Sequence, residues 1–552
     1  MKIVKYLIPV FAALALCACN DEPTGTSTKV PVGGEEQPEE PEKPEEGGDD
    51  IVSPTPSFGL VSEKVTVDPA KTYQTMEGFA ASDCWLPNQI GKYWTQNRLQ
   101  IATWLFSSDV VGDQPKGIGL SMWRVNLGAG TAEQGEASGI DANNRAEAYL
   151  VDGKYDWNKC EGQQYFMQQA LRNGCESFVF FSNSPLVQFT KNGKGYSDSG
   201  SNANLKDDCY DDFATYLATV AKHFTDEGYK VTHISPVNEP QFNWNGTSQE
   251  GSGWKNAQIA TLAKELDKAL EDQKCNTRIL IPEATAWDQL HSGNSSDRGG
   301  QIKAFFDPSS ANYVGDLAHM DKVVAGHSYW SFDNWTAMRN ERAKVAKAVE
   351  PLGLRVWQTE WSMLDKEPSE LGGSYDDVTE FDIAQYMSRV IHNDLVVAGC
   401  SSWSYWTSMS VERYSQKNRF ELIQTTPAGG NYSDDFTQEG SIRATHNLWV
   451  LGNYSLFVRP GYIRVDLAHK DTKEFFGSAW AKPDGSQIVV VYTNTDKTKG
   501  VELDNTFADG KELKSVYTYT TSATKDLQKV QFNTKDKVFI DPLSVTTVVY
   551  NF

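Results

Sequence analysis

The stretch VTHISPVNEPQFNW, residues 231–244, joins an apolar run to an Asn-Glu-Pro triplet. Proline lacks a backbone N–H and its ring fixes φ, so Pro240 cannot continue the interior of a strand or a helix. The chain must therefore leave its regular element at this point. Glu239 is predicted to lie at the end of a strand.

Runs of this kind, rich in apolar, β-branched or aromatic residues, recur eight times between residues 75 and 410. They cover 76–82, 118–128, 177–185, 231–240, 278–287, 323–332, 354–363 and 398–408. Between them lie segments such as 211–228 and 256–273, whose apolar residues recur at intervals of three and four, as in amphipathic helices. Eight strand–helix repeats predict an α/β fold of the (β/α)₈ or TIM-barrel type. A doubly wound open sheet is the alternative, but no Gly-rich phosphate loop follows the first strand.

Two glutamates end strands of this predicted barrel. Glu239 ends the fourth strand, and Glu360, in WQTEWSM, ends the seventh. Active sites of such barrels lie at the carboxyl ends of the strands. Two facing carboxylates are what glycoside hydrolysis requires, one to protonate the leaving oxygen and one to attack the anomeric carbon. Either glutamate alone would more often be a cap, an ion-pair partner or a solvated charge, but their joint placement favours catalysis.

The motifs around these glutamates resemble those of a known family. Asn238-Glu239-Pro240 and Thr359-Glu360-Trp361 resemble the acid/base and nucleophile motifs of the retaining clan A glycosidases, and most closely those of glycoside hydrolase family 30 in its endo-β-1,6-galactanase-like branch. The resemblance covers most of residues 60–552. Further matching segments are EGFAASDCW at 77–85, RVNLGAG at 124–130, FSNSP at 181–185, QEG at 249–251 and LWVLGNYSLFVRPGY at 448–462.

The resemblance implies that Glu239 is the general acid/base and Glu360 the nucleophile, without a metal or other cofactor. An acid must be protonated near neutral pH, so burial and the nearby nucleophile should raise the pKa of Glu239. Asn238 would hydrogen-bond the 2-hydroxyl of the sugar; a turn-forming role before Pro240 is the alternative.

Seven further residues at the predicted rim are candidates for substrate binding. Arg124 would need a buried carboxylate partner inside a barrel, and Glu360 is a suitable one. For the tryptophans, packing in the barrel core is the alternative. On the loop after strand eight, Arg413, Lys417 and Arg419 would suit an acidic sugar if they faced the cleft; otherwise they are solvated charges. The seven candidates are Trp85, Arg124, Asn183, His327, Tyr329, Trp403 and Trp406.

The N-terminus begins with two lysines and an apolar run of signal-peptide length. The run ends in Leu16-Cys17-Ala18-Cys19, which resembles a bacterial lipoprotein box. This implies removal of residues 1–18, lipidation of Cys19 and anchoring in the outer membrane; an ordinary secretory signal is the alternative. Asn20-Asp21-Glu22 resembles the export signal of surface lipoproteins in Bacteroidetes-type bacteria, which would place the protein at the cell surface.

Residues 19–57 are predicted to be a disordered acidic stalk. Positions 20–50 carry eleven acidic residues, two lysines and no aromatic residue, so they cannot bury enough apolar surface to fold. The whole chain has a formal net charge of −22, which argues against a nucleic-acid partner.

The pattern changes after residue 450 to short β runs with turn signals. A (β/α)₈ barrel over 76–447 is therefore predicted to carry a β-sandwich over 448–552, joined by strands from 58–75. No Gly-, Ser- or Pro-rich linker separates the two, which favours an integral side domain over an independent carbohydrate-binding module. The six cysteines after Cys19 lack metal-binding spacing and are expected to be buried thiols, with one or two disulfides left open.

The predicted function is therefore a retaining endo-glycoside hydrolase acting on an extracellular β-linked polysaccharide, as a monomer. The resemblance implies β-1,6-galactan, the side chain of arabinogalactan, as first substrate. The alternatives within the family are a xylanase or glucuronoxylanase and a β-1,6-glucanase. From another class, a surface glycan-binding lipoprotein could keep the barrel without its chemistry, but it would not need both Glu239 and Glu360.

Overall fold

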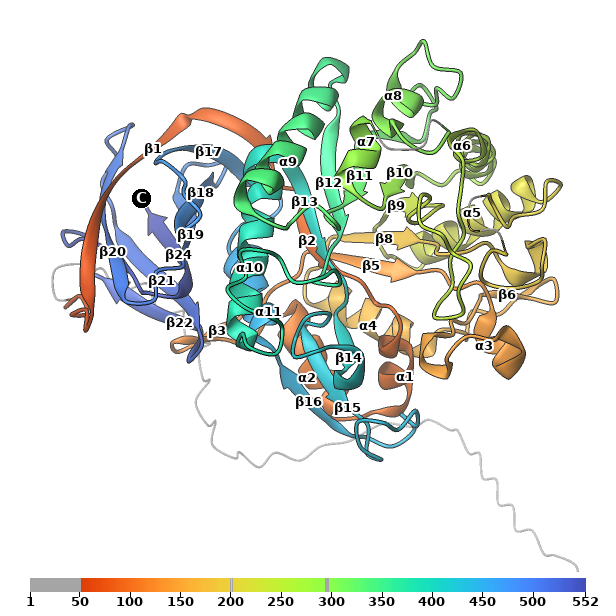
Figure 1. The fold of residues 1–552 in the computed structure, drawn as a ribbon, viewed down its shortest axis with the longest axis horizontal. Helices are drawn as coiled ribbons and strands as arrows, with labels where there is room; N and C mark the ends of the chain where they lie inside the picture. The colour runs from red at the N-terminus through yellow and green to blue at the C-terminus, as the bar shows by residue number, and fades with distance from the viewer. Residues whose placement is uncertain (1–50, 199, 201, 293–296) are drawn as a thin grey trace, which may run out of the picture. The chain divides into compact units, whose positions relative to one another are not determined.

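The eight predicted strands form one closed parallel sheet (Figure 1). The computed structural model describes residues 51–198, 200, 202–292 and 297–552. The strand order is β2-β13-β12-β11-β10-β9-β8-β5, and a bridge between Ser82 and Arg124 closes the ring between β2 and β5. The strands are β2 (Gly78–Ala81), β5 (Met122–Asn126), β8 (Ser177–Phe181), β9 (Val231–Ser235), β10 (Arg278–Ala284), β11 (Met320–His327), β12 (Arg355–Glu360) and β13 (Cys400–Tyr405).

Helices cover the outside of the barrel, with their apolar faces turned toward the strands. The two helices expected at 211–228 and 256–273 are confirmed as α5 (Tyr210–Asp226) and α6 (Asn256–Asp272). Thr379 and Asp382 form a reciprocal capping box at the start of another helix, α10, which satisfies two otherwise unpaired N–H groups. The remaining α-helices are α1 (Leu86–Tyr93), α2 (Asn97–Phe106), α3 (Thr131–Gln134), α4 (Glu161–Arg172), α7 (Trp287–His291), α8 (Gln301–Phe306), α9 (Trp335–Val349), α10 (Glu380–Asn393) and α11 (His446–Ser455).

Short strands that the sequence analysis missed lie in the loops. A three-stranded sheet follows β13 and consists of β14 (Met409–Val411), β15 (Ile423–Thr426) and β16 (Ser441–Ala444). Two-residue hairpins pair β3 (Val110–Val111) with β4 (Gln114–Pro115) and β6 (Leu150–Val151) with β7 (Lys154–Tyr155). Strands this short have little hydrophobic periodicity to reveal them.

The side domain is a nine-stranded sheet in the order β22-β21-β24-β19-β18-β17-β1-β20-β23. The two ends of this sheet lie close together: the ring centroids of Phe532 on β22 and Phe539 on β23 are 5.3 Å apart. One apolar cluster fills the space inside, as in a β-sandwich. Its strands are β1 (Gly59–Thr75), β17 (Ile463–Ala468), β18 (Phe475–Ala481), β19 (Gln487–Asn494), β20 (Lys499–Phe507), β21 (Ser515–Ser522), β22 (Lys525–Phe532), β23 (Phe539–Ile540) and β24 (Ser544–Asn551).

Strand β1 ties the start of the chain into this C-terminal sheet. It pairs in parallel with β20 and antiparallel with β17, and its register with β17 shifts after Asp68 and after Thr72. In Figure 1, β1 arches along one side of the sheet before the chain enters the barrel. The side domain is therefore built from both ends of the described chain.

The predicted boundary at 447/448 falls inside α11, which packs on both domains. Gly452 lies so close to Ile118 and Leu527 that a Cβ would approach both to within 2.8 Å. The buried Asn453 amide donates hydrogen bonds to the Tyr519 carbonyl, 2.9 Å away, and to the Thr547 hydroxyl, 3.1 Å away. The LGNYS segment thus holds barrel and side domain together.

The other predictions for the chain ends have mixed outcomes. The signal segment, Cys19 and residues 20–50 lie outside the described residues. The predicted stalk end at 57 is too late, because the Ile51 carbonyl and the Ser53 hydroxyl accept hydrogen bonds from Asn533.

All six cysteines after Cys19 are free thiols, and five of them are buried. No helix among the described residues has the length and apolar character needed to cross a membrane.

We expect Asn453→Ala to lower the free energy of unfolding by about 1–3 kcal/mol, because it leaves the buried Tyr519 carbonyl without its donor. Urea denaturation followed by tryptophan fluorescence measures the change. Asn158→Ala, at an exposed residue bonded only locally to Asp156, is the control and should stay within about 0.5 kcal/mol of wild type. Equal midpoints for the two variants would contradict the role given to α11.

Candidate active site

Glu239 and Glu360 meet at the carboxyl ends of the barrel strands. Glu360 is the last residue of β12, and Glu239 lies four residues beyond β9. One carboxyl oxygen of each, together with a ring nitrogen of His327, lie within 4.8 Å of one another. Both glutamates are almost fully buried, but each keeps a small exposed surface, 7% for Glu239 and 4% for Glu360. The short separation matches retaining glycosidases, at about 5–5.5 Å, rather than inverting ones, at about 6.5–9.5 Å.

The backbone turns sharply at Glu239. Its φ is +44°, in the left-handed region that a residue with a Cβ seldom adopts. Its N–H donates to the Glu283 carbonyl, 3.0 Å away, and its own carbonyl accepts from the Trp244 indole, 3.1 Å away. These bonds hold the turn and direct the carboxyl group toward the barrel axis.

Arg124, on β5, connects the two motifs from beneath. Its Nη1 donates to Glu360 Oε2 at 2.6 Å, and its Nη2 donates to Asn238 Oδ1 at 2.9 Å. The guanidinium carbon lies 3.6 Å from the centroid of the Phe181 ring, so the group is stacked as well as paired. The structure therefore gives Arg124 the carboxylate partner that a buried arginine needs.

His327, at the end of β11, bridges two carboxyl groups. Its Nδ1 lies 3.0 Å from Glu239 Oε1, and its Nε2 lies 3.1 Å from Glu283 Oε2. Burial opposes a charge on the imidazole, but Glu360, Glu239 and Glu283 together raise the pKa of His327 to about 9. The imidazolium is therefore the form at neutral pH, and both of its N–H groups donate.

Glu283, on β10, is the central site residue that the sequence analysis missed. It is fully buried, its Oε2 lies 3.6 Å from an Arg124 nitrogen, and it accepts short hydrogen bonds from the Ser235 and Thr359 hydroxyls. Although burial opposes ionisation, Arg124 and His327 lower the pKa of Glu283 to about 2. Its signal in the sequence was the same as that of Glu239, a glutamate beside a proline at the end of a predicted strand.

Burial raises the pKa of Glu239, against the effect of the His327 hydrogen bond, and the charge of Glu360 adds to the rise. The site holds three carboxyl groups, Glu239, Glu283 and Glu360, and two cationic groups, Arg124 and His327. A buried cluster is most stable when its charges cancel, so one carboxyl must carry a proton. Glu283 is held ionised and Glu360 is paired at 2.6 Å with Arg124, which leaves Glu239 as the protonated one.

The balance of charges in this cluster also explains why Glu239, His327 and Glu360 are a poor metal site. The three can offer ligand atoms within 4.8 Å of one another. A metal ligand histidine must be neutral, however, whereas this imidazole is held protonated. Arg124 and His327 already supply the positive charge that a cation would bring.

Tyr329 and the asparagines complete the polar lining. The Tyr329 hydroxyl donates to Glu360 Oε1 at 3.2 Å, and burial raises the pKa of this phenol well above its usual value, so it remains a donor. Asn238 donates to Asn183 Oδ1 at 3.0 Å, and Asn183 donates to Asn126 Oδ1 at 3.3 Å. Asn183 thus orients Asn238, which still has one amide hydrogen and one lone pair to offer a sugar hydroxyl.

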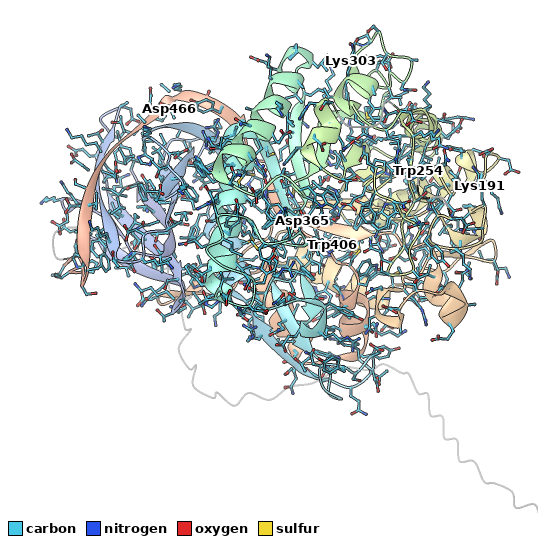
Figure 2. The ribbon with its side chains drawn as sticks, viewed as in Figure 1. Lys191, Trp254, Lys303, Asp365, Trp406 and Asp466 are labelled. Atoms are coloured by element: carbon cyan, nitrogen blue, oxygen red, sulfur yellow. The ribbon has the colours of Figure 1, made fainter. Side chains whose placement is uncertain are left out.

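Two of the three predicted tryptophans lie together near the site. Trp85, after β2, and Trp406, after β13, meet edge to face with centroids 5.3 Å apart, and both pack with the Phe181 ring that underlies Arg124. Figure 2 labels Trp406, which lies over the barrel strands in that view. The expectation that Trp403 lines the cleft is wrong. Trp403 is fully buried, and its indole donates to Asp394 at 2.8 Å on the outer side of the barrel.

The three cations after β13 neither face an acidic sugar nor remain solvated. Arg413 is bonded to Asp434 and to the carbonyls of Asn431 and Ser433. Lys417 donates to the carbonyls of 375, 376 and 378, and Arg419 to those of 363, 364 and 365. All three fasten loops to one another, which the composition of the loop alone could not indicate.

Two other buried acids, also missed from the sequence, hold loops around the site. Asp83 accepts from the Asn126 N–H at 2.8 Å and from the Gln163 amide at 2.8 Å, and burial raises its pKa to about 7. Glu250, in the QEG segment, accepts from the Ala129 N–H and from the Thr131 hydroxyl, and burial raises its pKa to about 7 as well. Asp83 connects the end of β5 with α4, and Glu250 connects the loop after β5 with the loop after β9.

The comparisons with known proteins agree with this geometry. The model of O-glycosyl hydrolase family 30 matches residues 62–419. An endo-β-1,6-galactanase from Hypocrea rufa is 27% identical over 266 residues, which are 43% of this chain and 54% of that enzyme. The chain thus spans about half the length of this curated relative.

Solved structures extend the likeness to the whole fold. A conserved exported protein from Bacteroides fragilis superposes with a TM-score of 0.81 at 31% identity, over 88% of this chain and 100% of that one. The catalytic domain of a family 30 xylanase from Talaromyces cellulolyticus has a TM-score of 0.62 at 18% identity, over 89% and 100%. An endo-β1,6-glucanase has a TM-score of 0.59 at 16% identity, over 88% and 94%. The chain belongs to O-glycosyl hydrolase family 30.

The raised pKa of His327 predicts a pH-dependent contribution to stability. The pKa is about 6.5 when unfolded and about 9 when folded, so the stabilisation is complete below pH 6.5 and is lost as the pH rises through 9. We expect the stability advantage of wild type over His327→Gln to fall by about 3 kcal/mol between pH 6 and pH 10. Urea denaturation at a series of pH values measures this difference.

His223→Gln is the matched control. Burial lowers the pKa of His223, so this residue is neutral in both states above pH 8 and its substitution should give a constant difference from pH 8 to pH 10. A constant difference over that range for His327→Gln as well would show that His327 is not a buried imidazolium.

Proposed function

We propose that the protein is a retaining endo-glycoside hydrolase that cleaves a β-linked polysaccharide by double displacement. The observation that carries the proposal is the approach of Glu239 and Glu360 to within 4.8 Å, inside a cluster that requires one carboxyl to be protonated. This is the pairing of acid and nucleophile that the reaction needs.

In the first step, Glu360 attacks the anomeric carbon, and the bond from that carbon to the leaving oxygen breaks. The leaving oxygen takes the proton of Glu239. His327 occupies Glu239 Oε1 as a donor, so the transferable proton is assigned to Oε2. Arg124 and Tyr329 hold the Glu360 carboxylate in place for attack.

In the second step, water takes the place of the leaving group, gives a proton to Glu239 and attacks the anomeric carbon, and the bond from that carbon to Glu360 breaks. Esterified Glu360 no longer carries a charge, so ionised Glu239 and Glu283 now balance Arg124 and His327. The cluster is neutral before and after the first step. This balance lowers the pKa of Glu239 at the stage when it must accept a proton from water.

We propose β-1,6-galactan, the side chain of arabinogalactan, as the substrate. The endo-β-1,6-galactanase from Hypocrea rufa supports this choice. The family 30 xylanase and the endo-β1,6-glucanase leave xylan and β-1,6-glucan as alternatives. Glucuronoxylan is disfavoured, because Arg413, Lys417 and Arg419 are all engaged within the protein.

Substitution of the two glutamates tests the reaction. Glu360→Gln should abolish release of reducing ends from β-1,6-galactan, whereas Glu239→Gln should reduce it by roughly 10²–10⁴-fold. A 2,4-dinitrophenyl β-glycoside needs no acid for departure, so Glu239→Gln should still give a burst of dinitrophenol on it, and Glu360→Gln should not.

Glu512→Gln, at an exposed glutamate of the side domain, is the control and should keep full activity. The same assay on galactan, xylan and β-1,6-glucan identifies the substrate. If wild type hydrolyses none of the β-glycans but binds one of them, the protein is a glycan-binding lipoprotein and the catalytic proposal fails.

We further propose that the protein is a lipoprotein of the outer membrane, exposed at the cell surface and anchored through Cys19 after loss of residues 1–18. The lipoprotein-like segment at 16–19 and the acidic stretch that follows support this. We expect wild type to partition with the membrane fraction and Cys19→Ala to lose that association, as seen by immunoblotting of fractions. Cys209→Ala, at a partly exposed thiol of the described chain, should partition as wild type does. Equal partitioning of wild type and Cys19→Ala would contradict the anchor.

A further inference from the structure

An exposed aromatic pair lies beside the carboxylates, on loops that follow β9 and β11. Trp330 is 59% exposed and Phe242 is 41% exposed. Their ring centroids lie 6.4 Å apart and their planes differ by 9°. Large apolar side chains that gather on a surface usually mark a binding site. We name Phe242 and Trp330 the rim pair.

The protein holds Trp330 in an unfavourable backbone conformation. Its φ is +52°, and its N–H donates to Asp365 Oδ2 at 2.7 Å. The Asp365 carbonyl is itself fixed by Arg419 and by the Tyr375 hydroxyl. A left-handed conformation is strained at a residue with a large side chain and persists where the surroundings enforce it. Hydrogen bonds of the fold thus hold the backbone of Trp330 so that its indole is exposed.

The rim pair is continuous with the catalytic machinery. Tyr329, the neighbour of Trp330, donates to Glu360, and the Phe242 N–H donates to the Glu239 carbonyl at 3.0 Å. Strands β9 and β11 flank β10, on the opposite side of the ring from β2 and β13, which carry Trp85 and Trp406. Aromatic residues therefore stand on both sides of the carboxylates.

The direction of the substrate follows from the chemistry of the acid. Glu239 gives its proton to the leaving oxygen, so the departing sugar must lie against Glu239. Phe242 belongs to the same turn as Glu239, which places the rim pair on the leaving-group side. Pyranose rings have flat faces of C–H groups that pack on aromatic rings, while their hydroxyl groups point outward to polar neighbours.

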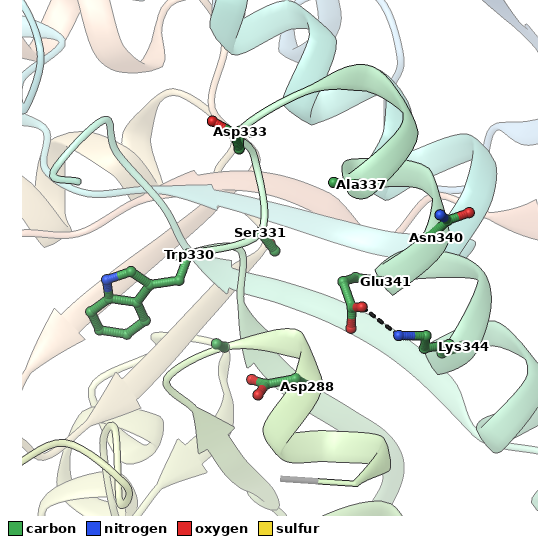
Figure 3. A pocket seen from close by; sticks show the side chains of 9 residues that line it. Asp288, Trp330, Ser331, Asp333, Ala337, Asn340, Glu341 and Lys344 are labelled. Atoms are coloured by element: carbon green, nitrogen blue, oxygen red, sulfur yellow. Dashed lines mark hydrogen bonds and ion pairs between the residues drawn. The ribbon is translucent and has the colours of Figure 1, made fainter. Parts of the chain in front are cut away.

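A cavity of about 740 Å³ continues beyond Trp330. Figure 3 shows the Trp330 indole at one end of this cavity, projecting away from the Glu341–Lys344 ion pair at the other end. Asp288, Asp333 and Glu341 line it against a single cation, Lys344, so the lining is acidic. An acidic cavity of this kind admits neutral sugar residues and repels uronic acids.

We propose that Phe242 and Trp330 form a binding platform for the sugars on the leaving-group side of the cut, and that the adjacent acidic cavity receives a further neutral sugar of the same chain. The inference rests on the proposed function, because the reaction assigns the leaving side to Glu239. Beyond that function, the inference assigns to Phe242 and Trp330 the preference for oligosaccharide chains over small glycosides.

Kinetics on two substrates test the platform. β-1,6-Linked galactotetraose places sugars on both sides of the cut, whereas β-galactobiosyl fluoride leaves the leaving side empty, because fluoride needs no sugar site. We expect Trp330→Ala to lower kcat/KM for the tetraose about tenfold or more and to leave the fluoride unchanged within about twofold. Phe242→Ala should act in the same direction. Tyr73→Ala, at a 41% exposed ring on β1, is the control and should change neither rate.

The outcomes separate this proposal from the proposed function. An equal loss on both substrates, or no loss on either, would overturn the platform. If wild type hydrolyses neither substrate, binding of galactotetraose, xylotetraose and gentiotetraose is measured by tryptophan fluorescence. Weaker binding by Trp330→Ala and Phe242→Ala than by wild type would support the platform although the catalytic proposal had failed. Unchanged binding, or no binding by wild type, would overturn both.

Discussion

The active site depends on one electrostatic constraint, which is that three buried carboxyl groups share two buried cations. Arg124 pairs with Glu360 at 2.6 Å and lies 3.6 Å from Glu283, while His327 bridges Glu283 and Glu239. A buried charge without a partner costs several kcal/mol, so the cluster must hold one proton. That proton belongs to Glu239, because Arg124 and His327 lower the pKa of Glu283 and Arg124 is paired with Glu360 at 2.6 Å. In the proposed reaction, charge balance as well as position therefore makes Glu239 the acid.

The barrel fold places the charged groups of the active site close together. Parallel strands bring Arg124, Glu283, His327 and Glu360 to one rim, although they are far apart in the chain. The bridge between Ser82 and Arg124 closes the barrel at the residue that pairs with Glu360, so closure and charge pairing are coupled. Left-handed backbone at Glu239 and Glu283, with φ of +44° and +56°, turns both carboxyls inward at some cost in strain. The site is rigid because each of its members is fixed by at least one other.

Much of the fold could be predicted from the sequence, because it rests on local periodicity. The eight strands and the helices α5 and α6 follow from patterns within about twenty residues. The short sheet β14-β15-β16 could not be predicted, since its strands carry three or four residues each. The ends of the predicted strands, together with the family motifs, selected Glu239 and Glu360, and the predicted rim added Arg124 and His327. Glu283 had the same signal but no motif to single it out. Trp403 and Trp406 shared the predicted strand 398–408, and the sequence did not determine which side chains of that strand point inward. The loop cations needed the folded loops, because their partners are backbone carbonyls.

The central claim is that Glu360 forms a covalent bond to the sugar while Glu239 gives its proton to the leaving oxygen. The most direct measurement is mass spectrometry of the protein after incubation with a 2-deoxy-2-fluoro-β-glycosyl fluoride of the sugar it hydrolyses, because the fluorine slows breakdown of the intermediate more than its formation. The account predicts a mass increase of one glycosyl unit, located by peptide mapping on Glu360. Rapid hydrolysis of the natural substrate with inversion at the anomeric carbon and no adduct, or an adduct on any other residue, would contradict it.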